Sequence, residues 1–291
     1  MGELIALFTA FCWTITVISF EYAGKRVGSL SVNMLRLLFG FVFITIYLVI
    51  TRGMIVPMDA TTHTWNWLLV SGFVGLVIGD YFLFQAFVDV GGRISLIILN
   101  IVPPLSAILG FFYFDETIGF YGVLGMVITI GAIVFVVLAR QDKATHPHAL
   151  RGGIFALIGA VAQAVGLLLS KNGMGDYNAF SAAQIRIIAA IIGFAIILTV
   201  NRRWGHMFQA FKHPSSIAFI IVGSFFGPFL GVASSLLALQ YIEVGIATTI
   251  AQLNIIMIIP FSIVLFHEKV SWKEVVGSVV AIVGVAILFL T

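Results

Sequence analysis

Long apolar runs, separated by a few charged residues, glycines or prolines, follow one another along the whole chain. A helix needs roughly 20 apolar residues to cross the hydrocarbon core of a bilayer, which is about 30 Å thick. Runs of about this length cover residues 4–22, 30–51, 66–88, 93–113, 118–139, 152–171, 180–200, 217–240, 245–266 and 272–291. The sequence therefore predicts an all-α polytopic membrane protein with ten transmembrane helices.

The composition excludes a soluble domain. Hydrophobic residues make up 61% of the 291 residues and charged residues only 9%, whereas an ordinary soluble domain has roughly 25% charged residues. The runs are expected to be helices, because they lack the in/out alternation that marks the strands of a membrane barrel. The single cysteine, Cys12, leaves no partner for a disulfide within the chain.

Lysine and arginine are unevenly distributed between the two sides of the membrane. With ten spans, both termini lie on one side, and the loops of that side hold only Arg52 and Lys171. The opposite side holds eleven basic residues, namely Lys25, Arg26, Arg93, Arg140, Lys143, Arg151, Arg202, Arg203, Lys212, Lys269 and Lys273. Because basic loops stay in the cytoplasm, we expect this plasma-membrane protein to have extracytoplasmic termini.

The chain also contains an internal repeat. Residues 2–53 align without gaps on residues 152–203, and residues 70–138 align on residues 222–290. The most informative matches are glycines and charged residues, because matches among Ile, Leu and Ala mean little in so apolar a chain. They pair Arg36 with Arg186, Gly75 with Gly227, Gly79 with Gly231, and Glu116 with Glu268.

Each copy of the repeat contains five predicted spans. Since five is an odd number, the two copies must have opposite orientations in the membrane. We expect a first repeat over residues 1–140, a second, inverted repeat over residues 151–291, and a connecting loop over residues 141–150. Inverted repeats are typical of secondary transporters, in which a site at the repeat interface opens alternately to each side.

The order of these features resembles the EamA-type branch of the drug/metabolite transporter superfamily over essentially the whole chain. The resemblance rests on the two five-helix repeats, Trp13 early in the first span, Arg36 and Arg186 in the second span of each repeat, and Glu116 and Glu268. It implies a transporter, since members mostly export amino acids and related metabolites, and others move nucleotide sugars, choline or drugs. The family is usually drawn with cytoplasmic termini, whereas the charge distribution of this chain predicts the opposite.

Several kinds of chemistry are not expected. The six histidines lie in loops or at the ends of spans, and no Cys, His or carboxylate cluster has the spacing of metal ligands. An intramembrane Ser–His protease would need a histidine inside a span. No glycine-rich phosphate loop with its lysine is present, which excludes ATP-driven transport by this chain alone. We expect no enzyme activity, metal or cofactor.

The expected partners follow from the same features. They are the lipid bilayer, a small-molecule substrate, and a coupling proton or ion. The basic residues form no stripe that would bind nucleic acid. The protein is expected to be a monomer or a homodimer.

Asp80 is the one acidic residue that lies well inside a predicted span. A carboxylate at this depth should face a cavity or a partner. Three interpretations remain open: a proton-coupling group, an anion for a cationic group of the substrate, or a structural carboxylate satisfied by the backbone or by Tyr81. Its repeat-mate is Val232, so Asp80 is not part of the shared scaffold.

Uncharged amide side chains also fall within spans, at Gln85, Asn100, Gln163, Gln184, Gln252 and Asn254. Such groups join helices by hydrogen bonds or line a largely apolar pocket with a few fixed polar points. The second interpretation predicts a substrate site made by these amides together with Trp13, Asp80 and Tyr81. Such a site favours a zwitterion or a neutral polar metabolite. The alternatives are an exporter of a cationic drug or amine, which would use Asp80 and an aromatic cage, and a non-transporting membrane sensor or assembly factor.

The two intramembrane arginines require partners or access to water. Inversion of the repeats places Glu268 on the side of Arg36 and Glu116 on the side of Arg186, so we expect gating pairs between the repeats. Snorkelling of the arginines to the interface, pairing of Arg36 with Glu21, and helix-end carbonyls are the alternatives.

Prolines and glycines mark irregular or closely packed helices. Pro103 and Pro104 are expected to interrupt the fourth span, and Pro260 the ninth. The pairs Gly75/Gly79 and Gly227/Gly231 place small residues on one helix face, where backbones approach closely.

Overall fold

The computed structural model describes residues 1–114, 119–139, 148–242, 247, 250–266 and 271–288. Over these residues the chain forms helices and connecting turns, and no strand. Six helices within the described part are long and apolar enough to cross a membrane: Gly2–Val27, Ser29–Arg52, Thr62–Val90, Leu150–Met174, Ala179–Val200 and Pro214–Tyr241. Two further apolar helices are shorter, Ile94–Leu109 and Phe120–Phe135. The all-helical membrane class predicted from the sequence is thereby confirmed.

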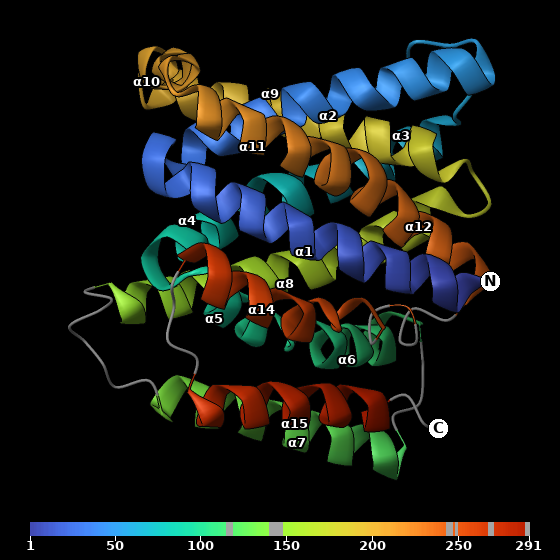
Figure 1. Ribbon diagram of the computed structural model, residues 1–291. Coiled ribbons are helices and arrows are strands. Elements are labelled where there is room, and N and C mark those ends of the chain that lie inside the picture. The colour runs from blue at the N-terminus through green and yellow to red at the C-terminus, as the bar shows by residue number, and fades with distance from the viewer. Residues whose placement is uncertain (115–118, 140–147, 243–246, 248–249, 267–270, 289–291) are drawn as a thin grey trace.

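The elements follow the two halves of the sequence alignment. The first half contains α1 (Gly2–Val27), α2 (Ser29–Arg52), α3 (Thr62–Gly72), η1 (Phe73–Gly79), α4 (Asp80–Val90), α5 (Gly92–Leu99), α6 (Val102–Phe114) and α7 (Phe120–Ala139). The second contains α8 (Ala149–Met174), α9 (Ala179–Val200), α10 (Trp204–Gln209), η2 (Ala210–Lys212), α11 (Pro214–Ser224), η3 (Phe225–Gly231), α12 (Val232–Tyr241), α14 (Asn254–Phe266) and α15 (Trp272–Leu288). The start of α1 and the end of α15 lie at the same end of the bundle (Figure 1).

Local sequence signals explain several helix boundaries. The side chain of Thr61 accepts a hydrogen bond from the backbone N–H of Thr64 and so caps α3. Asn178 caps α9 in the same way through the N–H of Ser181. Gly28, with a φ of 82°, makes the tight connection between α1 and α2, a conformation that favours glycine.

Two wide, π-helical segments occupy matching positions in the repeats. η1 lies between α3 and α4, and η3 lies between α11 and α12. Both segments begin and end at residues that the sequence alignment pairs with each other, and both span seven residues. Only η3 contains a proline, Pro228, so proline is not the common cause of the wide turns. π-Helical turns occur frequently at functional sites, and Asp80 follows η1 directly.

A second pair of irregularities interrupts the fourth and ninth spans. In the first repeat the interruption falls at Asn100 and Ile101, directly before Pro103 and Pro104 in the first turn of α6. In the second repeat it falls at the aligned residues 252–253, directly before α14. The predicted interruption at the first site is therefore confirmed. The predicted interruption at Pro260 is wrong, because α14 continues through this residue.

The two halves exchange packing partners. α1 packs along α11, η3 and α12 of the other half, and α8 packs along α3, η1 and α4. The second contact is very close, since a Cβ built on Gly166 of α8 would lie 2.7 Å from the Cα of Gly75. Gly227 makes the corresponding approach to Thr16 of α1, where an added Cβ would lie 2.8 Å from the side chain. The glycines therefore allow the helices of opposite repeats to touch, while α7 and α15 pack together at one side of the bundle (Figure 1).

Candidate functional site

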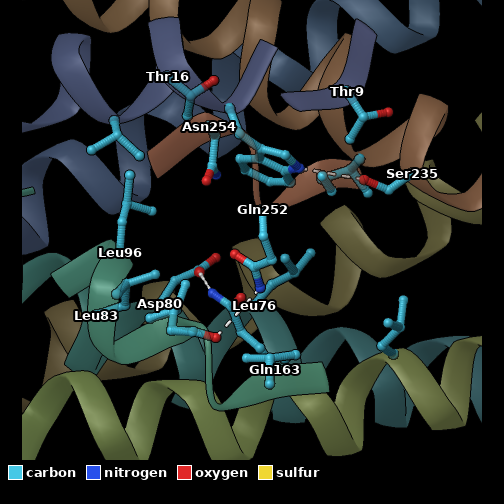
Figure 2. A pocket seen from close by; sticks show the side chains of 18 of the residues that line it. Thr9, Thr16, Leu76, Asp80, Leu83, Leu96, Gln163, Ser235, Gln252 and Asn254 are labelled. Atoms are coloured by element: carbon cyan, nitrogen blue, oxygen red, sulfur yellow. Dashed lines mark hydrogen bonds between the residues drawn. The ribbon is translucent and has the colours of Figure 1, made fainter. Parts of the chain in front are cut away.

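A cavity of about 190 Å³ lies between the two halves of the chain. α1, α2, η1, α4, α5 and α6 line it from the first half, and α8, α9, α12 and the start of α14 line it from the second. Much of the wall is apolar, and the polar lining side chains are Thr9, Trp13, Thr16, Arg36, Asp80, Gln163, Arg186, Ser235, Gln252 and Asn254. Figure 2 shows Asp80, Gln163, Gln252 and Asn254 directed into the same space.

Arg36 and Asp80 form an ion pair inside the bundle. Only 2% of the surface of Arg36 and 5% of that of Asp80 are exposed. The Nε of Arg36 donates a second hydrogen bond to Oδ1 of Asn33, one turn earlier on α2, at 3.0 Å. The ring of Phe84 lies 4.6 Å from the guanidinium carbon and covers its face. Arg36 is therefore neutralised and held by residues of its own repeat.

Asp80 is also bonded from the opposite repeat. The side-chain amide of Gln163, on α8, donates to Oδ1 of Asp80 at 3.4 Å (Figure 2). The backbone carbonyl of Asp80 accepts from the side-chain amide of Asn33 at 3.3 Å. The carboxylate therefore joins α2, α4 and α8 at the wall of the cavity, and a change in its charge acts on both repeats.

Arg186 lines the same cavity but has a different environment. Its exposed fraction is 7%, and its Nε has no hydrogen-bond partner. No ion pair of Arg186 is found among the described residues. Gly75 leaves room beside the guanidinium, since an added Cβ there would lie 3.1 Å from Nη2. Among the described residues, the second arginine is thus a buried cation at the cavity wall that lacks a direct ion pair, although the charge of Asp80 acts on it electrostatically.

Five of the nine residues proposed for substrate binding line the cavity: Trp13, Asp80, Gln163, Gln252 and Asn254. The indole Nε1 of Trp13 donates to the hydroxyl of Ser235 on α12 at 3.4 Å (Figure 2). The amide of Gln252 donates to the carbonyl of Leu99 at 3.5 Å, so the two interrupted helices meet at the cavity. The carbonyl oxygen of the Asn254 side chain has no partner.

The other four, Tyr81, Gln85, Asn100 and Gln184, are not among the lining residues. Tyr81 is 39% exposed and packs edge-on against the adjacent Phe82. Gln184 donates to Thr45 and to the carbonyl of Ile55, at 2.8 and 2.9 Å, and so joins α9 to the first repeat.

Gln85 and Asn100 have contrasting environments. Gln85 accepts from Ser29 at 2.8 Å and donates to Asp89 at 2.9 Å, and Asp89 in turn pairs with Arg151. Asn100 is fully buried, and neither polar atom of its side chain has a partner. The hydrogen bond from Ser29 joins Gln85 to another helix, which gives Gln85 a structural role. The amide of Asn100 makes no hydrogen bond to the described residues that would give it such a role.

The expected gating pairs involve residues outside the described part of the chain. Glu116 and Glu268 both fall there, so the pairs Arg36–Glu268 and Arg186–Glu116 stay predictions. The partner that the structure gives Arg36 is Asp80, which the sequence analysis did not consider. The alternative partner Glu21 forms an ion pair with Lys25 at 2.7 Å.

Sequence reasoning also missed hydroxyl groups of the cavity. Thr9 and Thr16 of α1 and Ser235 of α12 line it, and Thr9 donates to Ser234 across the repeats at 2.9 Å. Such residues are too common in membrane helices to be singled out from one sequence. The position of both arginines at the cavity could have been predicted from the sequence, because a charged residue deep in a span needs a partner or a polar cavity.

The lining residues are buried to different degrees at the two ends of the cavity. Phe87 and Leu96, near the junction of α4 and α5, are each 3% exposed. At the opposite end, Leu239 and Ala251 are partly exposed. Apolar side chains therefore close the cavity at the end where α1 finishes. The end where α1 begins is lined by both buried residues, such as Ala6 and Ala238, and partly exposed ones.

Apolar helices of spanning length surround an interior cavity that has charged and polar groups in a mainly apolar wall, and together they define a multi-pass membrane protein. Comparison with protein families matches residues 1–138 and residues 150–290 to the EamA-like transporter family. The chain belongs to this family, whose members are transporters rather than enzymes. The resemblance noted in the sequence is thereby confirmed.

Comparison with solved structures gives the same fold at low sequence identity. One similar chain, titled "Crystal structure of protein", has a TM-score of 0.67 and 14% identity, and the match covers 99% of this chain and 96% of that one. At this identity the similarity shows the fold alone. The search of curated proteins found no match.

Proposed function

We propose that this protein is a secondary transporter that exports a small polar metabolite, such as an amino acid, across the plasma membrane by alternating access. The observation that carries the proposal is the cavity between the repeats, with Arg36, Asp80 and Arg186 in its wall. Charged side chains at membrane depth are costly, and they mark substrate and ion pathways. A purely structural membrane protein has no use for such a cavity, which argues against the assembly factor, and release of substrate across the membrane distinguishes a transporter from a sensor.

The proposed architecture is two inverted five-helix repeats with ten spans. Support comes from the wide turns η1 and η3 and from the interruptions at Asn100 and Gln252, which occur at aligned positions. The exchange of packing partners between α1 and α8 also supports it. A site at the interface of inverted repeats can be exposed to either side when one repeat moves against the other.

The charges of the cavity favour a zwitterion over the alternative substrate, a cationic drug or amine. Asp80 is already paired with Arg36 and accepts a hydrogen bond from Gln163. A substrate cation would have to displace Arg36, whereas an anionic group meets a net positive wall made by two arginines and one aspartate. Apolar lining residues such as Leu76 and Leu83 suit the remainder of a small metabolite.

The enclosure of one end of the cavity fits a single state of an alternating-access cycle. In that state, Phe87 and Leu96 close the end that carries most basic loops, and the other end is the route for substrate. Opening of the closed end requires the contacts near the α4–α5 junction to separate. We propose a coupling proton or ion as the energy source, with Asp80 as the group that responds to it.

Efflux from proteoliposomes tests the proposed function. Vesicles containing the purified protein would be loaded with a mixture of radiolabelled amino acids and diluted into amino-acid-free buffer. We expect release faster than from protein-free vesicles, and slower release from Gln163→Ala and Asn254→Leu, which alter the cavity wall. A matched control is Gln209→Ala at the exposed end of α10. Release no faster than from empty vesicles would refute amino-acid export.

A further inference from the structure

We propose that Arg186 binds a singly charged anionic group of the substrate, a carboxylate, and that the second repeat has lost the partners that would otherwise neutralise it. This inference rests on the proposed transport function. It assigns Arg186 a direct contact with substrate, in place of the gating role expected from the sequence.

The two arginines occupy aligned positions but have different neighbours. In the first repeat, Asn33 accepts a hydrogen bond from Nε of Arg36, and Asp80 neutralises the guanidinium. The residues aligned with Asn33 and Asp80 in the second repeat are Ala183 and Val232. Apolar residues therefore stand at the positions of both partners, and Nε of Arg186 has no hydrogen-bond partner among the described residues.

A buried cation without partners is unfavourable for the folded protein. The cost of desolvating an ion is recovered only when a counter-charge and hydrogen bonds are supplied. Arg186 lines the cavity and is only 7% exposed. The backbone of Gly75 lies beside its guanidinium group. The charge of Asp80 acts on Arg186 electrostatically, but Asp80 is already paired with Arg36. A ligand in the cavity can supply Arg186 with a counter-charge of its own.

The geometry selects the kind of anion. A guanidinium presents parallel N–H donors that match the two oxygens of a carboxylate. The charges of Arg36 and Asp80 neutralise each other. Arg186 therefore gives the cavity wall a net charge of one positive unit. A small cavity with one net charge and a mainly apolar lining suits a monocarboxylate, and it disfavours a polyanion such as a nucleotide.

The location of Val232 strengthens the argument. Val232 is itself a lining residue, so the missing carboxylate would have faced the cavity. A substrate carboxylate would thus supply to Arg186 the charge that Asp80 supplies to Arg36. In this view each arginine is neutralised by a carboxylate, one built into the chain and the other delivered by the substrate.

The test uses a mixture that differs only at the carboxyl group. Proteoliposomes of the full-length protein would be loaded with amino acids, the matching amino-acid amides and the matching decarboxylated amines, and release would be followed by mass spectrometry. We expect the wild-type protein to release carboxylates and to retain amides and amines. Arg186→Gln should reduce carboxylate release at least about tenfold, as expected for loss of a desolvated charge pair, and Arg186→Lys should give intermediate release.

Two further measurements separate binding from folding. Because no ion pair of Arg186 is found in the described part of the chain, Arg186→Gln should leave the melting temperature unchanged or raise it, whereas loss of a structural arginine would lower it. Val232→Asp places a carboxylate in the cavity wall at the position aligned with Asp80 and should block release of carboxylates while the protein stays folded. Arg203→Gln, at an exposed loop position, is the matched control and should release carboxylates like the wild type.

The outcomes distinguish this inference from the proposed function. If no compound of the mixture is released by any variant, amino-acid export itself fails and the role of Arg186 fails with it. If carboxylates are released but Arg186→Gln and Val232→Asp both release them normally, export stands and the anion site is refuted. Equal release of amides and carboxylates by the wild type would also refute the site.

Discussion

Arg36 on α2 and Asp80 at the start of α4 form an ion pair that is almost completely removed from solvent. The pair fixes the second helix of the first repeat against the helix that carries the wide turn η1. Through Gln163, it also reaches the first helix of the second repeat. One carboxylate is thus in contact with the scaffold, with the repeat interface and with the cavity.

Replacement of Asp80 should affect stability as well as transport. Asp80→Asn leaves the charge of Arg36 buried without its counter-ion, which costs about 3–5 kcal/mol when one partner of such a pair is removed. We expect a lower melting temperature in detergent, and no coupled transport between pH 6 and 8. The observed ion pair adds this effect on folding to the loss of transport expected for a proton-coupling group.

The double variant Asp80→Asn/Arg36→Gln is the control for this prediction. It removes both charges, so its melting temperature should lie above that of Asp80→Asn. If the double variant is less stable than Asp80→Asn by a further similar amount, the two residues stabilise the protein independently. Normal transport by Asp80→Asn would exclude the carboxylate as the proton-coupling group.

The two buried asparagines should respond differently to the same change. Asn100 lies outside the cavity wall and has no partner for its amide, so Asn100→Leu should leave transport unchanged and raise stability by about 1 kcal/mol or more. Asn254 lines the cavity, and Asn254→Leu should slow transport. Thermal unfolding and efflux of the two variants, measured side by side, check both expectations. Loss of transport in Asn100→Leu would instead place this residue in the substrate path.

The close approach of η1 and α8 should not tolerate even one methyl group. A Cβ at Gly166 would lie 2.7 Å from the Cα of Gly75 and 3.0 Å from its backbone nitrogen, so Gly166→Ala must push two backbones apart. Overpacking of this kind costs about 1–3 kcal/mol. The melting temperature should fall accordingly.

Gly131→Ala provides the matched control. Gly131 also lies in a helix, α7, but an added Cβ meets no atom within 4 Å. Alanine there should be neutral or stabilising by up to about 1 kcal/mol, because alanine favours the helix more than glycine does. Equal effects of the two substitutions would show that the helix contact at Gly75 does not limit packing.

A hydrogen-bonded cluster outside the spans predicts a pH effect. Partial burial acts to raise the pKa of Asp59, but hydrogen bonds from Tyr177 and Arg52 outweigh it and leave the pKa below the ordinary value of 3.8. A lowered pKa in the folded state means that the stabilisation is present above pH 3.8 and is lost as the pH falls through the folded value. Asp59→Asn should therefore lower the melting temperature slightly at pH 7, and the difference from the wild type should shrink in acid. A difference that is constant with pH would mean that the charge of Asp59 contributes nothing.

The orientation of the protein can be tested directly. The eleven-to-two distribution of lysine and arginine predicts that the end of the bundle holding the termini faces away from the cytoplasm. A C-terminal reporter that is active only in the cytoplasm should stay inactive, and a reporter inserted after Arg203 should be active. The reverse result would give this protein the orientation usual in its family.

The helical membrane fold could be predicted from the sequence because the lipid bilayer restricts every spanning segment. Each span must be long, apolar and internally hydrogen-bonded. The sequence also predicted the interruption before Pro103, since proline lacks a donor. It missed the interruption at Gln252, where no proline marks the site, and the wide turn η1, which has no proline either. Such distortions depend on neighbouring helices, which a single sequence does not specify.

Only part of the candidate site could be predicted from the sequence. Trp13, Gln163 and Asn254 line a common cavity, but nothing in their spacing distinguished them from Gln184, which joins helices instead. Rotation of each helix about its axis decides this, and nearly uniform hydrophobicity hides that rotation. Depth was more informative: Arg36 lies seven residues from the start of α2 and Asp80 ten residues before the end of α4, so both lie at a similar distance from the same membrane face.

The paired wide turns also record the order in which the protein was assembled. η1 and η3 occupy aligned residues, so the simplest history places this irregular turn in an ancestor with a single repeat, before the gene was duplicated. Asp80 and Asn33 have no counterparts at Val232 and Ala183, so the charge difference between the halves arose after duplication. If the cavity is the transport site proposed above, its shape is then the older feature, and its preference for a particular substrate arose later.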